Sequence, residues 1–333
     1  MRVSEFEIIQ YIREITEVSG IPREVIIPNG DDCFVFGFNG KALATTDTMV
    51  DGIHFLSERF SPYDIGVKSA ISNLSDIASM GGNPLYALIS LIVPPSTELE
   101  VILDIYRGLV DTFSNYGVYI GGGNISKGRD LTITVTLFGN CSDVPLTRSG
   151  AKKGDLIFVS GFVGDSSLGL EILLKKGKGP YLSEVESYLV SKHISPTPRI
   201  ELGKRLVGIA TSCIDISDGL LQDIEHILNS SGVGAKISLE KVPISSEYSV
   251  YISREKRYSS LVGFFKYPLS GGEDYELVFT VPYNLKEKVL NISKELNVKL
   301  TEIGEITENP GKLELFYFEE RIDEKEYKGW KHF

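Results

Sequence analysis

Apolar and polar residues recur with two different periods along the chain, and the change of period predicts a mixture of helices and strands. Apolar residues stand at near-helical spacing over residues 4–18, which predicts an amphipathic helix. A second helix is predicted over residues 61–82, which begin with Ser-Pro and end at Gly-Gly, a typical start and stop. Residues 85–93 are mostly apolar and residues 131–138 alternate, so both segments are predicted strands.

A hairpin is predicted near the N-terminus, where two short β-type runs, 33–38 and 41–46, flank Asn39-Gly40. An Asn-Gly pair is a strong signal for a two-residue turn between strands. Acidic residues stand at both outer ends of this pattern, Asp31-Asp32 before it and Asp47 after it. A hairpin would bring these carboxylates together.

Several helix starts are predicted from small polar residues. Thr97 and Glu100 have the spacing of a capping box for the helix that follows. Further along, Asp165 or Ser166 is predicted to cap one helix and Ser217 to cap another. The N-terminus of the helix after Ser217 has free N–H groups and partial positive charge, so it either binds an anion or is simply a well-capped end.

Glycines cluster at 121–123, directly before Asn124, and predict a loop. Backbone N–H groups of such a loop can approach a ligand closely, as in phosphate-binding loops. An ordinary turn is equally consistent with the pattern.

The chain has 333 residues, more than one ordinary hydrophobic core accommodates. A Gly-, Ser- and Lys-rich stretch at 139–154 has the character of a boundary. We therefore expect two domains, residues 1–143 and residues 144–333.

Composition and charge narrow the possible partners and the compartment. The net charge is −11 and no basic stripe with aromatic residues is present, so nucleic acid is not an expected partner. The three cysteines lie far apart, which argues against disulfides or a thiolate zinc site and fits a reducing compartment. The charged N-terminus is unlike a signal peptide, and no apolar run approaches the ~18 residues of a membrane span, so we expect a soluble cytoplasmic protein.

Acidic residues next to glycine, serine or threonine form clusters that suggest a site for hard divalent cations. The clusters are Gly30-Asp31-Asp32, Thr45-Thr46-Asp47, Asn73-Leu74-Ser75-Asp76, Asp215-Ile216-Ser217-Asp218-Gly219 and Gly271-Gly272-Glu273-Asp274. Mg²⁺ prefers oxygen ligands and commonly shares substrate phosphates. Any one of these acids taken alone is as well explained as solvated surface; their number favours a magnesium-dependent enzyme acting on a nucleotide.

The common nucleotide-binding and nucleophilic motifs are absent. The sequence contains neither the P-loop pattern nor the protein-kinase loop motifs. Ser217 has no adjacent histidine, and the acidic neighbours of Cys33 would raise the pKa of its thiol. The remaining chemistry is electrostatic: metal ions held by dispersed carboxylates, and phosphoryl transfer by positioning and charge neutralisation.

Longer motifs run in order over almost the whole chain. They are Gly-Asp-Asp-Cys (30–33), Thr-Thr-Asp-Thr-Met-Val-Asp-Gly-Ile-His-Phe (45–55), Asn-Leu-Ser-Asp-Ile-Ala-Ser-Met-Gly (73–81), Arg-Ser-Gly-Ala-Lys-Lys-Gly-Asp (148–155), Ile-Asp-Ile-Ser-Asp-Gly-Leu (214–220), Ser-Gly-Gly-Glu-Asp-Tyr-Glu-Leu (270–277) and Gly-Trp-Lys-His-Phe (329–333). Together they resemble the thiamine-monophosphate kinase family, within the aminoimidazole-ribonucleotide-synthetase-like superfamily.

The resemblance implies a fold and an activity. The fold is α/β and α+β: an N-terminal domain that binds metal and ATP and dimerises through its sheet, and a C-terminal α+β domain that completes the active site. The implied reaction is direct in-line transfer of the γ-phosphoryl group of ATP to thiamine monophosphate, with several Mg²⁺ ions, in a cytoplasmic homodimer.

The resemblance also implies roles for individual residues. Implied metal ligands are Asp32, Thr45, Thr46, Asp47, Asp76, Asp215 and Asp218, and among these Asp47, Asp76, Asp215 and Asp218 are the catalytic residues. Implied nucleotide contacts are Tyr106, Gly123, Arg148 and Ser217, and implied substrate contacts are His54, Glu273 and Trp330. Two of these have plain alternatives: Trp330 could merely pin the C-terminus, and Tyr106 could be a core residue of its helix.

One position departs from the family pattern. The glycine run of the family commonly ends Gly-Gly-Asp-Thr, with the aspartate a metal ligand, whereas this chain has Asn124 followed by Ile125. Asn124 still offers a neutral carbonyl oxygen to a metal ion or to the nucleotide site. The resemblance therefore implies a weaker metal position here, and predicts that Asn124→Asp tightens the dependence on Mg²⁺.

Two other functions stay open at this point. A sister synthetase or maturation enzyme of the same fold would activate an amide or carbamoyl oxygen, and would be expected to have a different substrate loop or a C-terminal cysteine; no cysteine follows Cys213. A non-catalytic metal- or nucleotide-binding regulator would not need the acidic clusters, which are retained except at Asn124. No general base is predicted, because a phosphate monoester is largely ionised near neutral pH, its second pKa being about 6.

Overall fold

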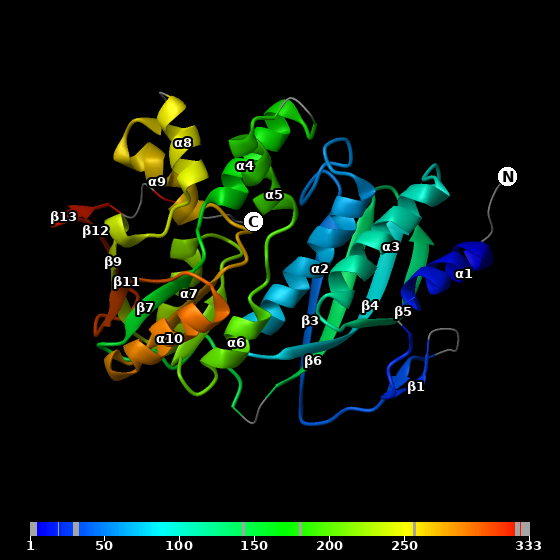
Figure 1. Ribbon diagram of the computed structural model, residues 1–333, viewed down its shortest axis with the longest axis horizontal. Helices are drawn as coiled ribbons and strands as arrows, with labels where there is room; N and C mark the ends of the chain where they lie inside the picture. The colour runs from blue at the N-terminus through cyan, green and yellow to red at the C-terminus, as the bar shows by residue number, and fades with distance from the viewer. Residues whose placement is uncertain are drawn as a thin grey trace. The chain divides into compact units, whose positions relative to one another are not determined.

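The computed structural model describes residues 5–18, 20–28, 33–141, 144–179, 182–255, 258–323 and 327. The chain forms two compact units, one of residues 1–77 and 82–143 and the other of residues 78–81 and 144–333 (Figure 1). Asp32 and Trp330, two of the predicted site residues, lie outside the described residues.

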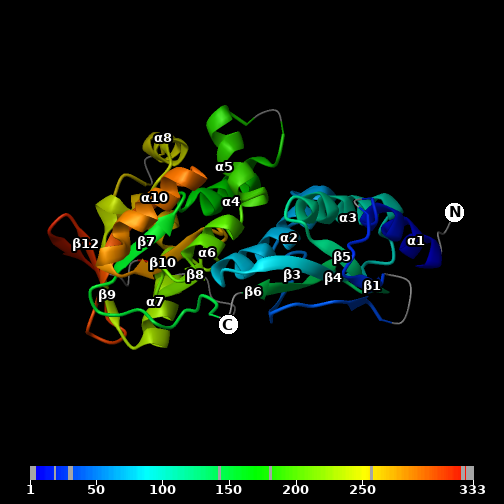
Figure 2. The same ribbon diagram turned by 60° about the horizontal axis from the view of Figure 1, so that its bottom comes forward.

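The first unit is a four-stranded sheet with helices on one face (Figure 2). Its elements are α1 (Glu5–Thr16), β1 (Val25–Ile27), β2 (Val35–Phe36), β3 (Lys41–Val50), α2 (Pro62–Ser79), β4 (Asn83–Val93), α3 (Leu99–Ser114), β5 (Tyr119–Lys127) and β6 (Thr132–Cys141). The sheet order is β3-β6-β4-β5, so β3 and β5 are its two edge strands. The predicted helices over 4–18 and 61–82 and the strands over 85–93 and 131–138 are confirmed.

Two local predictions in this unit are wrong. The segment 33–38 does not form a hairpin with β3, because β2 pairs with β1 while β3 pairs with β6 over its whole length, from Lys41 to Val50. A ladder of that length outweighs the local turn preference of Asn39-Gly40. The glycine run is not a loop either but part of β5, with an irregularity in its pairing with β4 near Gly121.

The second unit contains a seven-stranded sheet, with α7 and α10 on opposite sides (Figure 2). Its elements are β7 (Leu156–Ser160), α4 (Asp165–Lys176), α5 (Glu184–Ile194), α6 (Ile200–Leu206), β8 (Ser212–Asp215), α7 (Leu220–Ser231), β9 (Gly234–Ser238), α8 (Ser246–Arg254), α9 (Leu261–Ser270), β10 (Leu277–Val281), α10 (Lys286–Leu296), β11 (Leu300–Thr307), β12 (Leu313–Tyr317) and β13 (Glu320–Ile322). The strand order is β13-β12-β9-β11-β7-β10-β8, and only β9 and β12 pair in parallel. Apolar residues of α7 and α9 cover one face of this sheet and form its core.

The predicted caps fail where backbone and neighbouring side chains decide the helix start. Helix α3 begins after Glu98, with no side-chain cap, rather than at a capping box of Thr97. Helix α4 begins after Gly164 and α7 after Gly219, again without a cap from Asp165 or Ser217. At α4, Asp274 from another segment binds N–H groups at the helix start. At α7, Asp223 of the helix itself binds the N–H groups of the residues just before it.

Candidate active site

In the first unit, side chains on one face of β3 contact side chains on one face of α2. Thr45 donates a hydrogen bond from its hydroxyl to Asp76 Oδ2. Two residues along β3, the half-buried Asp47 lies against Ser72. Burial raises the pKa of Asp47, and the hydrogen bond with Ser72 acts in the opposite direction. Thr45 and Asp47 lie on one face of the strand because they are two residues apart, and Ser72 and Asp76 lie on one face of the helix because they are four apart. Both carboxylates are therefore held on regular elements.

The face of α2 below these acids is packed with buried polar residues. Asn73 is 0% exposed and donates from Nδ2 to Ser69 O (3.1 Å) and Ser72 Oγ (3.3 Å). Ser69 Oγ bonds to Ile65 O at 2.7 Å, and Lys68 is also fully buried. The amide nitrogen of Asn73 is therefore directed back along α2, away from Asp76.

The other predicted residues of this unit lie on different surfaces. Thr46 faces away from α2, since its hydroxyl lies 3.1 Å from Val135 O and 3.1 Å from Thr136 Oγ1. Gly123 and Asn124 are exposed on β5, the edge strand opposite β3. A Cβ at Gly123 would lie only 1.8 Å from Ile89 O, so the glycine is needed for β5 to pack on β4.

Tyr106 and His54 complete the list for the first unit. Tyr106 is 4% exposed in α3, and burial raises the pKa of its phenol strongly. This burial supports the core-packing alternative for Tyr106.

His54 is half-buried after β3, and its Nδ1 accepts a hydrogen bond from Val50 N at 3.1 Å, which leaves Nε2 as the N–H donor of the neutral ring.

In the second unit, the segment 215–219 links the end of β8 to the start of α7. Asp215 is 3% exposed at the end of the strand, and Ser217 and Asp218 are half-buried in the turn that follows. Gly219 has a φ of 121°, and a Cβ there would lie 2.9 Å from the carbonyl carbon of Ser270. Only glycine fits this tight exit into the helix.

The segment 271–276 pairs with this turn through the backbone. Glu273 N donates to Ser217 O (2.9 Å), Tyr275 N donates to Ile216 O (2.9 Å) and Ile216 N donates to Glu276 O (2.8 Å). The backbone is strained here, because Glu273 and Tyr275 have φ values of 64° and 51°. The motifs at 214–220 and 270–277 are therefore joined by backbone hydrogen bonds, a pairing that the sequence alone did not reveal.

Two further acids of this segment hold it in place. Asp274 is 6% exposed and accepts hydrogen bonds from Gly164 N (2.7 Å) and Ser166 N (3.1 Å) at the start of α4. Glu276 accepts from Arg199 Nε (2.6 Å) and Nη2 (2.5 Å). Sequence reasoning missed both supports; the alternation of acids in Glu-Asp-Tyr-Glu was the available signal.

Glu273 and Arg148, the remaining predicted contacts, are accessible. Glu273 has a side chain 28% exposed, with Oε2 3.5 Å from Nδ1 of the buried His193. Arg148 is exposed, and its carbonyl accepts a hydrogen bond from Ser231 Oγ (3.3 Å), which ties its loop to the end of α7. The guanidinium is thus presented on an anchored loop, as a phosphate contact requires.

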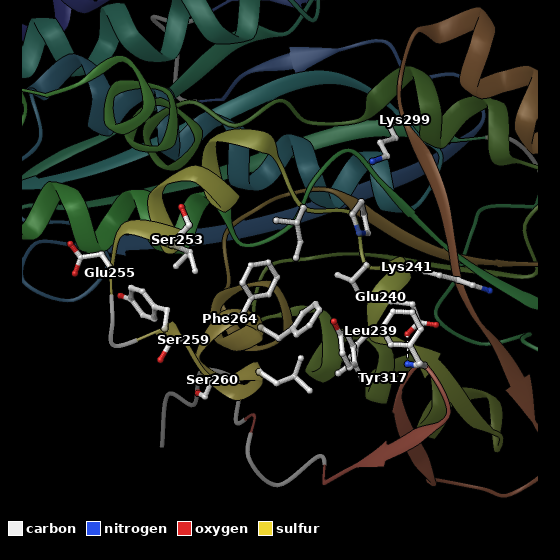
Figure 3. A pocket seen from close by; sticks show the side chains of 18 residues that line it. Leu239, Glu240, Lys241, Ser253, Glu255, Ser259, Ser260, Phe264, Lys299 and Tyr317 are labelled. Carbon is white, nitrogen blue, oxygen red and sulfur yellow. Dashed lines mark hydrogen bonds between the residues drawn. The ribbon is translucent and has the colours of Figure 1, made fainter.

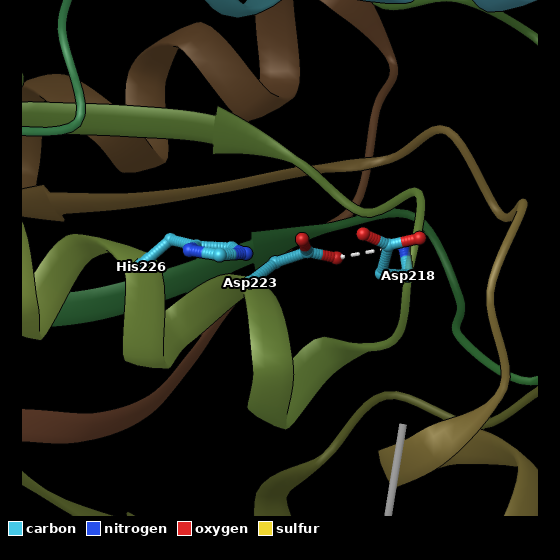
Figure 4. A group of neighbouring side chains, drawn as sticks. All are labelled: Asp218, Asp223 and His226. Atoms are coloured by element: carbon cyan, nitrogen blue, oxygen red, sulfur yellow. Dashed lines mark hydrogen bonds between the residues drawn. The ribbon is translucent and has the colours of Figure 1, made fainter. Parts of the chain in front are cut away.

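A further group of ionisable side chains lies between the turn 215–219 and the first turns of α7. Ligand atoms of Asp218, Asp223 and His226 lie within 4.8 Å of one another (Figure 4). Asp223 is 1% exposed; burial, followed by the charges of Asp215 and Asp218, raises its pKa to about 8, against the hydrogen bonds from the 217–218 backbone.

The second unit also contains an apolar cavity. It has a volume of about 930 Å³ and is lined by aromatic residues such as Phe264 and Tyr317, with Lys241 and Glu240 at its edge (Figure 3). None of the predicted site residues lines it.

The fold of each unit and its acidic residues define a class of protein, and comparison with known proteins agrees. Residues 30–141 match the family model described as AIR synthase related protein, N-terminal domain, and residues 152–315 match the corresponding C-terminal domain. The chain therefore has the two-domain AIR-synthase-like fold. Among the described helices, none is long and apolar enough to span a membrane.

Full-length relatives narrow the class to one family. The thiamine-monophosphate kinase of Haemophilus influenzae is 39% identical over 315 residues, 93% of this chain and 92% of its own length. A crystal structure of thiamine-monophosphate kinase from Stenotrophomonas maltophilia superposes with a TM-score of 0.81, 30% identity and coverage of 95% and 97% of the two chains. A structure described as AaThiL complexed with AMPPCP and TMP has a TM-score of 0.76 and 34% identity, covering 100% of this chain and 99% of that one. The chain belongs to the thiamine-monophosphate kinase family and is a kinase.

Proposed function

We propose that this protein transfers the γ-phosphoryl group of ATP to thiamine monophosphate, giving thiamine diphosphate and ADP. Support comes from the relatives that share its full length, one of them with an ATP analogue and TMP in its structure. The observation that carries the proposal is the presence of both acidic half-sites, Asp47 with Asp76 and Asp215 with Asp218, each on a well-supported element.

The donor atoms of these half-sites fit Mg²⁺. They are carboxylate and hydroxyl oxygens, with no thiolate, which is the set that hard divalent ions prefer. We propose Thr45, Asp47, Asp76, Asp215 and Asp218 as ligand donors, with Asp32 as a further candidate. The predicted ligand Thr46 is left out, because its hydroxyl lies against Val135 and Thr136 on the other face of the sheet. When bound, Mg²⁺ neutralises the charge of the polyphosphate and of the developing transition state.

The chain's own residues orient the two substrates for in-line transfer. Arg148 and Ser217 bind the nucleotide phosphates, the former through the planar fork of its guanidinium. His54 offers its Nε2 hydrogen, and Glu273 its carboxylate, to the thiamine phosphate; the assignment of Trp330 rests on the resemblance alone. No side chain needs to remove a proton, since the acceptor phosphate is already largely ionised.

We also propose that the active unit is a homodimer in which β5 of one chain faces β3 of the other. Adjacent strands are about 4.8 Å apart, so β3 and β5 lie roughly 14 Å apart across the sheet of one chain. Asp47 on β3 and Gly123 or Asn124 on β5 are too far apart to contact one ion or one phosphate. The open face also carries exposed Thr46 and half-exposed Leu88, consistent with a partner surface.

Co-expression of two defective chains tests this dimer. Asp47→Asn removes a donor from β3, and Asn124→Arg places a positive charge on β5. If β5 serves the partner, a mixed dimer contains one site with both defects and one with neither, so activity returns on mixing. If both residues serve a site within one chain, every site stays defective and no activity returns.

The reaction itself is tested by incubating the protein with ATP, Mg²⁺ and thiamine monophosphate and measuring thiamine diphosphate by chromatography. Product that requires all three components supports the proposal. Turnover of ATP with an amide or carbamoyl acceptor, and none with thiamine monophosphate, would favour a sister synthetase. Nucleotide binding without any turnover would favour a regulator.

A further inference from the structure

The carboxylate of Asp223 binds three consecutive backbone N–H groups of the turn that carries Ser217 and Asp218. Its Oδ2 accepts from Ser217 N at 3.1 Å, Asp218 N at 3.2 Å and Gly219 N at 3.2 Å. The side chain is 1% exposed, so the interaction is shielded from water. Buried N–H bonds to a carboxylate are among the stronger hydrogen bonds in proteins.

This arrangement is not an ordinary helix cap. Helix α7 runs from Leu220, and a capping side chain would come from residue 219, which is glycine. Asp223 instead lies inside the first turn and reaches backward to N–H groups before the helix. Successive N–H groups that converge on one point form an anion-binding nest, as in phosphate-binding loops. Here the acceptor is a side chain of the following helix, so the N–H groups of residues 217–219 are already occupied by Asp223.

The turn is consequently held on both of its sides. Asp223 fixes the N–H groups of residues 217–219, while the carbonyls of Ile216 and Ser217 accept from Tyr275 N and Glu273 N, each at 2.9 Å. The backbone that carries Asp215, Ser217 and Asp218 is therefore set before any ligand arrives. Such preorganisation matters most where several ligands must be placed within a fraction of an ångström.

A metal centre made of Asp218, Asp223 and His226 is the competing interpretation of the cluster in Figure 4. The hydrogen bonds argue against it. Three N–H groups direct their positive ends at Asp223 Oδ2, and a cation beside that oxygen would face the same positive ends. His226 is moreover exposed and sits one turn further along α7.

We propose that Asp223 is a positioning residue: it occupies the nest formed by residues 217–219 and so sets the geometry of Ser217 and Asp218 for nucleotide and metal. The inference rests on the proposed function, since it concerns the same site. Loss of partners that orient metal ligands typically costs roughly 10- to 100-fold in metal affinity or activity.

The test compares Asp223→Ala, Asp223→Asn and His226→Ala with a matched control. The control is Asp155→Ala, because Asp155 is 5% exposed in the same unit and accepts from Lys152 N (2.9 Å) and Thr211 Oγ1 (2.6 Å), outside the proposed site. For each purified full-length variant we would measure the Tm, the shift of Tm on adding Mg²⁺ with AMPPCP, and the kcat and KM for ATP.

Asp223→Ala is expected to raise the Mg²⁺ half-saturation and the KM for ATP by roughly 10- to 100-fold and to lose most of the ligand-induced Tm shift. Asp223→Asn keeps an acceptor oxygen and should recover most of both. His226→Ala should match the wild type, and Asp155→Ala should lower the Tm while leaving the ligand-induced shift intact.

Three outcomes would overturn the inference. Asp223→Ala could behave like Asp155→Ala, which would make Asp223 a stability residue only. Asp223→Asn could be as defective as Asp223→Ala at unchanged Tm, or His226→Ala could weaken Mg²⁺ equally, and either result would point to metal ligation. Failure of the proposed function is recognised separately, because the wild type would then neither turn over thiamine monophosphate nor be stabilised by Mg²⁺ with AMPPCP.

Discussion

The two units hold their acidic residues in different ways. In the first unit Asp47 and Asp76 stand on a long strand and a long helix, whose periods bring the two carboxylates to one face. In the second unit Asp215 and Asp218 stand at a strand end and in a turn, and the turn is fixed by Asp223 and by the backbone of the segment 271–276.

This difference predicts which substitutions should disturb the ligand positions in each unit. A ligand on a regular element depends on the packing of the whole unit, so few single neighbours are critical. A ligand on a turn depends on a small number of hydrogen bonds and on glycines that permit close approach. We therefore expect supporting residues to matter more for activity in the second unit than in the first.

The largest effect should come from the carboxylates themselves, one from each unit. Asp76→Asn and Asp215→Asn should each lower kcat/KM on the order of 1,000-fold, because charge stabilisation of the transferring phosphoryl group is lost. Steady-state kinetics with thiamine monophosphate measures this. Asp130→Asn, which changes an exposed acid of the first unit, is the control and should be neutral. A mild effect in one unit only would mean that the half-sites do not act on one substrate.

The second unit should also show a pH dependence of stability that comes from its buried acids. Burial raises the pKa of Asp165 from an ordinary 3.8 to about 6, although Ser245 and Tyr188 donate hydrogen bonds to it. A raised folded pKa favours the protonated form, so this contribution to stability is complete below about pH 4 and is lost as the pH rises to about 6. The size is about 3 kcal/mol.

Asp165→Asn removes that titration. The wild type loses stability between pH 4 and pH 7 and the variant does not. The difference in free energy of unfolding, variant minus wild type, should therefore be about 3 kcal/mol larger at pH 7 than at pH 4. Chemical denaturation of both proteins at the two pH values gives the difference. An unchanged difference between pH 4 and pH 7 would show that Asp165 titrates normally.

A glycine of the second half-site offers a sharper test of the turn. A Cβ at Gly272 would lie 2.2 Å from Ser217 O, so Gly272→Ala must push the two segments apart. Activity should fall roughly 100-fold, the usual consequence of a displacement near 1 Å. Gly232→Ala is the matched control, since Gly232 has φ 68° but no atom within 4 Å of an added Cβ, and should cost about 1 kcal/mol of stability without changing KM. Equal kinetics for the two variants would contradict a rigid turn.

The smallest effect is expected on the edge strand of the first unit. Asn124→Asp restores a charge on β5 and should lower the Mg²⁺ half-saturation by roughly threefold to tenfold, a small change because phosphates share the ion. A Mg²⁺ titration of activity at saturating ATP measures it. An unchanged titration curve would count against Asn124 as a ligand position.

The contrast between the units also explains what could be predicted from the sequence. Strongly periodic segments such as 61–82 and 131–138 were predictable, because the period fixes both the element and its buried face. The pairing of β3 with β6 was not, since it depends on contacts between segments that no local pattern encodes. The binding of the 217–219 backbone by Asp223 was not either, since the sequence motif does not show which way that side chain turns. Acids could be recognised as candidates by their neighbours, whereas a supporting acid such as Asp223 could not, and the supporting role of Asp274 could not be told from a ligand role.

Single turnover with γ-labelled ATP tests the central claim most directly. The protein, in excess over ATP and with Mg²⁺ and thiamine monophosphate present, is quenched over time, and the label is followed in ATP, protein, free phosphate and thiamine diphosphate. The account predicts that label leaves ATP and enters thiamine diphosphate at the same rate, with none on the protein. Label that accumulates on the protein or as free phosphate, with no labelled thiamine diphosphate, would contradict it.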